Sequence, residues 1–229
     1  MPSVRRFDTA AGRIAAIVEN VSASLREALQ TRGKAGLIVS GGSTPRPVFA
    51  ALAQQPIEWS RIYITLADER WVSPDDQDSN EHLVRQHLLR EAAAPAHFIP
   101  LKNAARDAAS GAAKADQALT AFPWPADILM LGMGDDGHTA SLFPRAPELQ
   151  AALHTDLHCI AVTPPAAPHQ RLSLSAHALM DARAVIIDIT GPAKWATYER
   201  AAAPGAVEEM PVRLILQQQR VPVHVYWSP

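Results

Sequence analysis

Short apolar runs alternate along this chain with longer segments whose apolar residues recur at helical spacing. The runs at Leu37–Val39, Ile62–Leu66 and Ile128–Leu131 have the length and continuity of strands buried on both faces. Amphipathic segments separate them, and the first extends from Asp8, its expected N-cap, to a stop before Gly33. This alternation predicts an α/β fold in which a mainly parallel sheet lies between two layers of helices, in a Rossmann-like three-layer αβα arrangement.

The alternation continues to the C-terminus. We expect further strands at His97–Pro100, Cys159–Val162, Leu172–Leu174, Val185–Ile189 and Val223–Tyr226. We expect further helices around Leu83–Leu89, around Ala104–Ala121 and from Pro192 onward, the first of them starting with a capping box of Asp78 and Glu81. Because no internal repeat or low-complexity linker divides the chain, residues 1–229 are predicted to form a single domain.

The composition restricts the partners of such a domain. Lys and Arg number 21 against 23 Asp and Glu, a net charge of −2, so we expect neither nucleic acid nor a membrane surface as partner. Cys159 is the only cysteine, which excludes an intrachain disulfide and favours a reducing compartment. With no apolar run of membrane-spanning length, we expect a cytoplasmic protein that binds a small anion in a local pocket. Monomer and homodimer both stay open.

In parallel sheets, ligands bind beyond the carboxyl ends of the strands, and the first such loop combines glycines with hydroxyl groups. Gly41 and Gly42 let backbone N–H groups approach a phosphate, and Ser43 and Thr44 add hydroxyls at the start of a helix that Thr44 can cap and Pro45 can open. A tight turn with an ordinary threonine cap explains the segment equally well. The ending lacks the Gly-Lys-Ser/Thr of nucleotide P-loops, which argues against ATP or GTP.

The second loop, predicted to extend from Asp68 to Asp78, begins with Asp68, Glu69 and Arg70. Arg70 can bind a phosphate through two parallel hydrogen bonds, and Asp68 can orient a hydroxyl or another side chain. An ion pair at the end of a strand is the simpler structural explanation of these residues taken alone.

The third loop, Gly132–Thr139, matches the G-x-G-x-x-G pattern of dinucleotide-binding folds. That pattern belongs to a first strand-helix unit and needs an acidic end on the next strand, which Cys159–Val162 lacks, so we expect no NAD(P). His138 is the distinctive residue of the loop, because a histidine at the end of a strand can act as a general acid or base. Asp135 or Asp136 can orient its ring.

Two further basic side chains are candidates for binding an anion. Lys194 lies in the first turn of the helix after Thr190-Gly191-Pro192, where a cation is unfavourable against the helix dipole unless an anion is present. Arg171 opens a strand after a proline-rich loop, and an ordinary exposed arginine is the alternative interpretation.

Two patterns imitate metal sites without their full ligand sets. Asp75, Asp76 and Asp78 lack the glycine and terminal glutamate of an EF-hand loop. His154 and His158 are four residues apart, yet a strand is predicted to start at Cys159 and no third ligand is evident. We therefore expect no metal site.

Four segments, taken in this order, closely resemble the 6-phosphogluconolactonase family. They are Ser40–Pro45, Asp68–Val72 with the nearby Asp75-Asp76 and Ser79-Asn80, Gly132–Pro144, and Gly191–Lys194. With Arg171 and the terminal Val225–Trp227, the resemblance covers nearly the whole chain, and the long third segment is its most specific part. The sequence departs mildly from the family around Trp195–Tyr198 and after Arg213.

The resemblance implies a fold shared with glucosamine-6-phosphate deaminases, ribose-5-phosphate isomerases and CoA transferases. It implies hydrolysis of 6-phospho-D-glucono-1,5-lactone in the oxidative pentose phosphate pathway, without a metal or other cofactor. The catalytic histidine of the family falls on His138 and its loop aspartate on Asp68, and its phosphate-binding positions fall on Gly41–Thr44, Arg70 and Lys194. Arg171 also matches a family position.

The residues support this chemistry without reference to the family. Neutral His138 can take a proton from water and return it to the leaving ring oxygen, and Asp136 can support the histidine. The oxyanion donor stays open between a backbone N–H in the stretch from Gly134 to Gly137 and a basic side chain.

Two other functions compete with lactone hydrolysis. Deaminases of glucosamine 6-phosphate carry an Asn-Glu-Pro segment where this chain has Ser141–Pro144, so the missing acid favours a lactonase. A non-catalytic sugar-phosphate sensor would keep the phosphate-binding groups and would not need His138.

Overall fold

A seven-stranded parallel sheet forms the centre of the computed structural model, which describes residues 2–229. Every pair of neighbouring strands in this sheet is parallel. In spatial order the strands are β1 (Ser3–Arg6), β10 (Val223–Ser228), β9 (Val185–Thr190), β6 (Ile128–Leu131), β2 (Ala35–Val39), β3 (Ile62–Leu66) and β5 (His97–Ile99). The prediction of an α/β fold around a mainly parallel sheet is confirmed.

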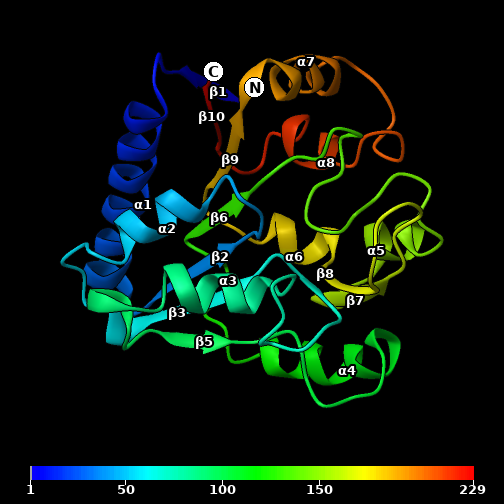
Figure 1. Cartoon of the computed structure of the whole chain (residues 1–229), viewed down its shortest axis with the longest axis horizontal. Coiled ribbons are helices and arrows are strands. Elements are labelled where there is room, and N and C mark those ends of the chain that lie inside the picture. The colour runs from blue at the N-terminus through cyan, green and yellow to red at the C-terminus, as the bar shows by residue number, and fades with distance from the viewer. Residues whose placement is uncertain (1) are drawn as a thin grey trace.

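Helices cover both faces of this sheet. Helices α1 (Ala10–Arg32) and α2 (Arg46–Leu52) lie on one side, and α7 (Gly191–Ala202) and α8 (Arg213–Leu216) lie on the other (Figure 1). As a result, every residue of β2 and β6 is buried, as their continuous apolar sequences predict. No helix within residues 2–229 is long and apolar enough to cross a membrane.

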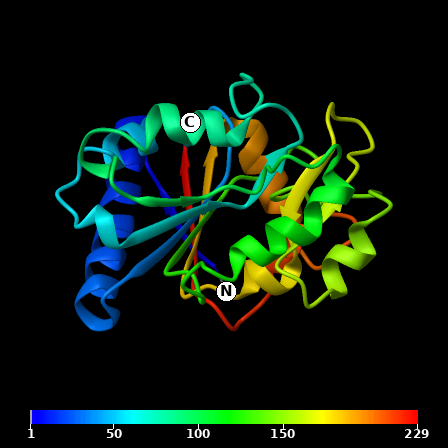
Figure 2. The ribbon, with the colours of Figure 1, turned by 90° about the horizontal axis from the view of Figure 1, so that it is seen from below.

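A second, three-stranded antiparallel sheet was not predicted. It has the order β4 (Asp68–Arg70), β8 (Arg171–Leu174) and β7 (Cys159–Val162). The helices α4 (Ala108–Leu119), α5 (Leu149–His154) and α6 (Ala176–Met180) gather around it, away from α1 (Figure 2). The prediction that Asp68–Asp78 is entirely loop is therefore wrong for its first three residues, which pair with a strand far along the chain.

The predicted caps of the first two helices are wrong. Thr9, not Asp8, caps α1, because its side chain is the one that accepts a hydrogen bond from the Gly12 N–H. Helix α2 has no side-chain cap: Pro45, in helical conformation, occupies the cap position that Thr44 was expected to take. The predicted stop of α1 is confirmed by Gly33, whose φ of 78° suits a residue without Cβ.

The cap of α3 (Asn80–His87) also differs from the prediction. The Ser79 hydroxyl accepts the hydrogen bond from the His82 N–H, in place of a capping box between Asp78 and Glu81. Glu81 instead forms an ion pair with Arg85, one turn further along the helix. Two short 3-10 helices, Trp59–Arg61 and Glu91–Ala93, complete the secondary structure of the described residues.

Candidate active site

A cavity of about 310 Å³ opens where the predicted loops meet at the carboxyl ends of the central strands. Its lining brings together nearly all of the predicted catalytic and binding residues: Gly41, Gly42, Ser43, Thr44, Asp68, Arg70, Gly134, His138, Arg171 and Lys194. Asp136 and Gly137 are not among the residues that line it. Segments from both sheets therefore contribute to one site.

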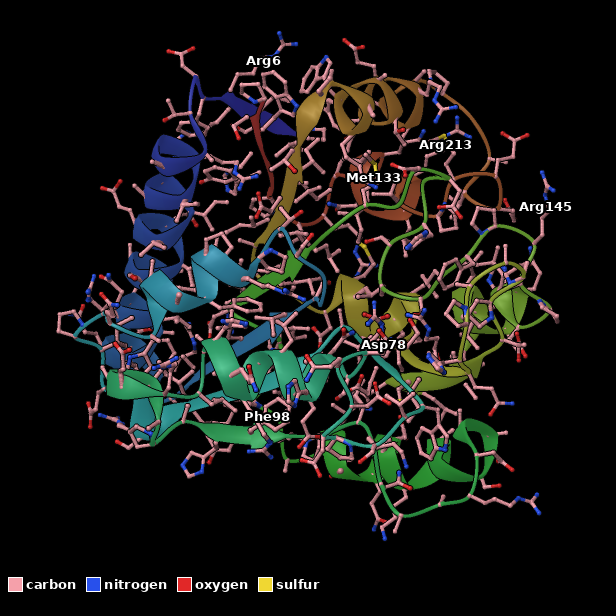
Figure 3. All side chains as sticks on the ribbon, in the orientation of Figure 1. Arg6, Asp78, Phe98, Met133, Arg145 and Arg213 are labelled. Carbon is pink, nitrogen blue, oxygen red and sulfur yellow. The ribbon has the colours of Figure 1, made fainter. Side chains whose placement is uncertain are left out.

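The loop after β6 presents His138 to this cavity. Met133, labelled in Figure 3, lies near the start of this loop. The Gly134 N–H donates to the His138 carbonyl over 2.8 Å, and the Gly137 N–H donates to the Gly134 carbonyl over 3.1 Å. Glycine is required at both positions. A Cβ on Gly134 would lie 2.0 Å from the His138 Nδ1, and Gly137 has a φ of 80° with Met210 against it.

Asp136 holds the ring of His138. Its Oδ1 lies 2.6 Å from the ring Nδ1 and also accepts a hydrogen bond from the His138 backbone N–H. Partial burial opposes ionisation of Asp136, but these two contacts outweigh it and lower the pKa of the carboxyl to about 2. Because an ionised carboxylate only accepts, Nδ1 of His138 carries the proton in this contact, and in the neutral tautomer the free lone pair is on Nε2.

Asp68 is the first residue of β4 and lies in a network of donors. It is buried, accepts a hydrogen bond from the Ser141 hydroxyl, and is 3.3 Å from the amide nitrogen of Asn80. Arg171 Nη1 is 3.7 Å from Asp68 Oδ2. Burial lowers the pKa of Arg171, while the negative charge of Asp68 acts in the opposite direction. The register of β4 with β8 brings these groups together.

Glu69 of β4 connects this strand to the start of α3 through hydrogen bonds. This fully buried carboxylate accepts hydrogen bonds from the backbone N–H groups of Arg70, Asn80 and Glu81 and from the Ser79 hydroxyl. Burial raises its pKa to about 7, although the backbone hydrogen bonds favour the charged form. Glu69 thereby fixes the positions of its neighbours Asp68 and Arg70.

Of the predicted phosphate-binding groups around the cavity, the Gly41–Thr44 loop and Lys194 lie at helix starts, and Arg70 ends strand β4. Gly41 packs so closely on Asn80 that a Cβ would lie 1.8 Å from the amide oxygen, and Gly42 has a φ of 105°. Lys194 is in the first turn of α7, where its Nζ is 2.8 Å from Asp135 Oδ1. The backbone of this region thus permits a close approach of an anion.

Comparison with known proteins identifies the family. The model that describes glucosamine-6-phosphate isomerases and 6-phosphogluconolactonase matches residues 8–227. The chain belongs to this family. It is 44% identical to a 6-phosphogluconolactonase of Pseudomonas aeruginosa, over 97% of this chain and 93% of that protein.

Solved structures agree with this assignment. A 6-phosphogluconolactonase from Shewanella baltica has a TM-score of 0.99 and 44% identity, with 100% of this chain and 98% of that chain covered. A monomeric glucosamine-6-phosphate deaminase, at 16% identity and a TM-score of 0.81 over 99% of this chain and 97% of that one, shares the fold. The expected family assignment and the expected fold relationship with glucosamine-6-phosphate deaminases are confirmed.

This family member has a buried acid in the cavity that the sequence analysis missed. Asp188 of β9 lines the cavity and is 5% exposed, with Arg13 Nη1 of α1 3.0 Å from its Oδ1. Burial raises the pKa of Asp188 to about 7, while Arg13 favours the charged form. A signal was present, because Asp188 is the only charged residue in the apolar run of Val185–Ile189.

Two polar residues around Asp68 were quoted from the family motifs without a role. Asn80 lines the cavity, and its amide oxygen is buried without a hydrogen-bond partner among residues 2–229. Ser141, fully buried, donates to Asp68. Their partners come from distant segments, so spacing along the chain holds no signal for these contacts.

The two histidines that imitate a metal pair do not share a helix. His154 ends α5 and His158 precedes β7, in the turn between these elements. Within residues 2–229 there is no group of three or more His, Cys, Asp or Glu side chains suited to hold a metal ion.

Proposed function

We propose that this protein hydrolyses 6-phospho-D-glucono-1,5-lactone to 6-phospho-D-gluconate, a step of the oxidative pentose phosphate pathway. Its relatives at 44% identity are named 6-phosphogluconolactonases. The observation that carries the proposal is the His138–Asp136 pair, in which the ring of His138 faces a cavity that is also lined by three cationic side chains, Arg70, Arg171 and Lys194.

His138 acts as the general base in this proposal. Its Nε2 takes a proton from water while the water oxygen bonds to the lactone carbonyl carbon. The tetrahedral intermediate then collapses, the bond to the ring oxygen breaks, and His138 returns the proton to that oxygen. General acid-base catalysis of this kind contributes about 10²- to 10⁴-fold. The phosphate group takes no part in these covalent steps.

Asp68 and Arg171 serve the reacting end of the substrate. Asp68 is held by Ser141 and Asn80, so its position is set before substrate binds and it can orient a sugar hydroxyl or the attacking water. The N–H groups of Gly134 and Gly137 donate to carbonyls within their own loop. We therefore assign the oxyanion to a basic side chain of the cavity, with Arg171 beside Asp68 as the candidate.

The phosphate is bound by Gly41–Thr44, Arg70 and Lys194. Backbone N–H groups, hydroxyls, a guanidinium and an ammonium are typical phosphate ligands, and they line one cavity with His138. Binding energy from this remote group orients the carbonyl toward the base. No metal or cofactor takes part in the proposed reaction.

The test is hydrolysis of freshly generated lactone in the presence of a chelator, with the spontaneous rate subtracted. We expect chelator-resistant turnover that falls about 10²- to 10⁴-fold in His138→Ala. His154→Ala, which removes an exposed histidine at the end of α5, is the matched control and should retain the parent rate. If His138→Ala turns over lactone as fast as the parent protein, His138 is not the general base.

If the parent protein gives no turnover above the spontaneous rate, lactone hydrolysis is wrong. Glucosamine 6-phosphate is then the next substrate to test. Phosphate-dependent binding that persists in His138→Ala, without turnover on either substrate, would indicate a sugar-phosphate sensor.

The phosphate ligands are tested separately from the base. Arg70→Ala and Lys194→Ala should each raise KM about 10-fold, because each removes a charged hydrogen-bond donor to the phosphate. A kcat that falls without any change in KM would argue against phosphate binding by these residues. Steady-state rates over a range of lactone concentrations separate the two results.

A further inference from the structure

Asp135 and Asp136 are adjacent in the chain, but their carboxylates bind different partners. Asp136 accepts from His138, whereas Asp135 Oδ1 lies 2.8 Å from the Nζ of Lys194. The Asp135 side chain is 82% exposed and that of Lys194 is 30% exposed, so the pair lies at the rim of the cavity. The proposed mechanism uses Lys194 and leaves Asp135 without a role.

The backbone of Asp135 is anchored to the helix that carries Lys194. Its carbonyl accepts hydrogen bonds from the Thr197 hydroxyl over 3.4 Å and from the Arg200 guanidinium over 3.2 Å. Arg200 also donates to the Thr197 hydroxyl, which joins the two donors. The fold therefore holds the Asp135 carboxylate within reach of Lys194.

We propose that Asp135 determines how tightly the cavity binds phosphorylated ligands, because it is the counter-ion of Lys194 until a phosphate displaces it. This inference rests on the proposed function, in which Lys194 is a phosphate ligand. A phosphate dianion that also contacts Arg70 and the Gly41–Thr44 loop competes well for Lys194. An anion that reaches only Lys194 competes poorly with Asp135 for it. The Asp135–Lys194 ion pair therefore favours phosphorylated ligands over other anions.

The competition acts equally on substrate and product, since both carry the same phosphate. Uniform weakening of this kind raises KM without slowing the chemical step, and it shortens the time that the product occupies the site. Asp135 is exposed, so it moves into water at little cost when the phosphate arrives. We therefore expect a modest effect, about two- to five-fold in affinity, as is typical of a partly exposed ion pair.

The experiment is calorimetric titration of the parent and Asp135→Asn with 6-phosphogluconate and with inorganic phosphate. Asparagine keeps the shape of the side chain and removes its charge. We expect Kd for both ligands to fall about two- to five-fold. Glu27→Gln is the matched control: it removes one negative charge from the exposed face of α1, near the end of that helix, and should leave both Kd values unchanged.

A double-mutant cycle decides whether the effect passes through Lys194. In a Lys194→Ala background, Asp135→Asn should no longer change the Kd for 6-phosphogluconate. An unchanged Kd in the single variant would overturn the inference, and so would equal tightening in both backgrounds. Failure of the parent to bind either phosphate ligand would overturn it as well.

The lactone assay keeps this inference separate from the proposed function. If the parent turns over lactone and Asp135→Asn binds no tighter, only the role of Asp135 is wrong. If the phosphate ligands bind as expected but no lactone is hydrolysed, the ion-pair competition stands and the proposed reaction is wrong.

Discussion

Two buried aspartates line the same cavity from different sheets, and their surroundings differ. Asp68, in the small antiparallel sheet, accepts from Ser141 and Asn80 and faces Arg171. Asp188, in the parallel sheet, has Arg13 beside it, but neither of its oxygens accepts a well-aligned hydrogen bond from residues 2–229. Two similarly buried aspartates therefore differ in the number of hydrogen-bond donors around them, and such donors favour the charged form of a carboxyl group.

The architecture of the two sheets explains this difference. The backbone donors of β9 are used by its neighbours β10 and β6, and apart from Asp188 and Thr190 the residues of β9 itself are apolar. Strand β4 is short and lies against the start of α3, where Ser79, Asn80 and Glu81 supply donors. Polar networks are thus easier to build beside the small sheet than within the large one.

The largest effect in this comparison is expected for Asp68→Asn. The change removes the charge that faces Arg171 and disturbs the contacts with Ser141 and Asn80, so kcat/KM should fall about 100-fold, or about 2.7 kcal/mol. Steady-state kinetics on the lactone measures it. A loss below about three-fold would show that the network around Asp68 is structural only.

A smaller effect, on stability and with a defined pH dependence, is expected for Asp188→Asn. With a pKa of about 7 in the fold and about 4 in the unfolded chain, the folded protein binds more protons in this window. The free energy of unfolding therefore falls as pH rises from about 4 to 7. Asparagine mimics the protonated acid, so the variant should lie close to the parent at pH 4 and exceed it by up to about 4 kcal/mol at pH 8, because each of the three pKa units is about 1.36 kcal/mol.

Urea unfolding at the two pH values measures this difference, and lactone turnover at pH 8 should change far less than in Asp68→Asn. If Asp188→Asn is less stable than the parent at pH 8, the ion pair with Arg13 outweighs the cost of burying the charge. The contrast between the two aspartates would then be wrong.

The smallest effect is expected for Ser141→Ala. It removes one of the donors to Asp68 and leaves the others, so turnover should fall about three- to ten-fold and the free energy of unfolding by about 1 kcal/mol. Ser60→Ala, at an exposed position before β3, is the matched control and should change neither. A Ser141→Ala loss as large as that of Asp68→Asn would mean that the serine positions Asp68 almost alone.

Much of the fold can be predicted from local sequence patterns. The apolar runs at Ile62–Leu66 and Ile128–Leu131 match β3 and β6 residue for residue. The loops that follow the strands became the walls of the cavity, as the geometry of parallel sheets requires. Helix starts were less predictable: Thr9 and Ser79 took the caps expected of neighbouring residues, because several side chains near each start can accept the same hydrogen bond.

The sequence by itself determined the parallel sheet, the loops at its carboxyl edge and the family, because strand length, helical spacing and contiguous motifs are local properties. Only the tertiary structure decided which carboxylate serves which partner. Asp136 holds His138 while Asp135 binds Lys194, and Asp68 accepts a hydrogen bond from Ser141, which lies 73 residues further along the chain. These contacts join residues far apart in the chain or choose between adjacent ones, and their geometry exists only once the strands have paired and the helices have packed.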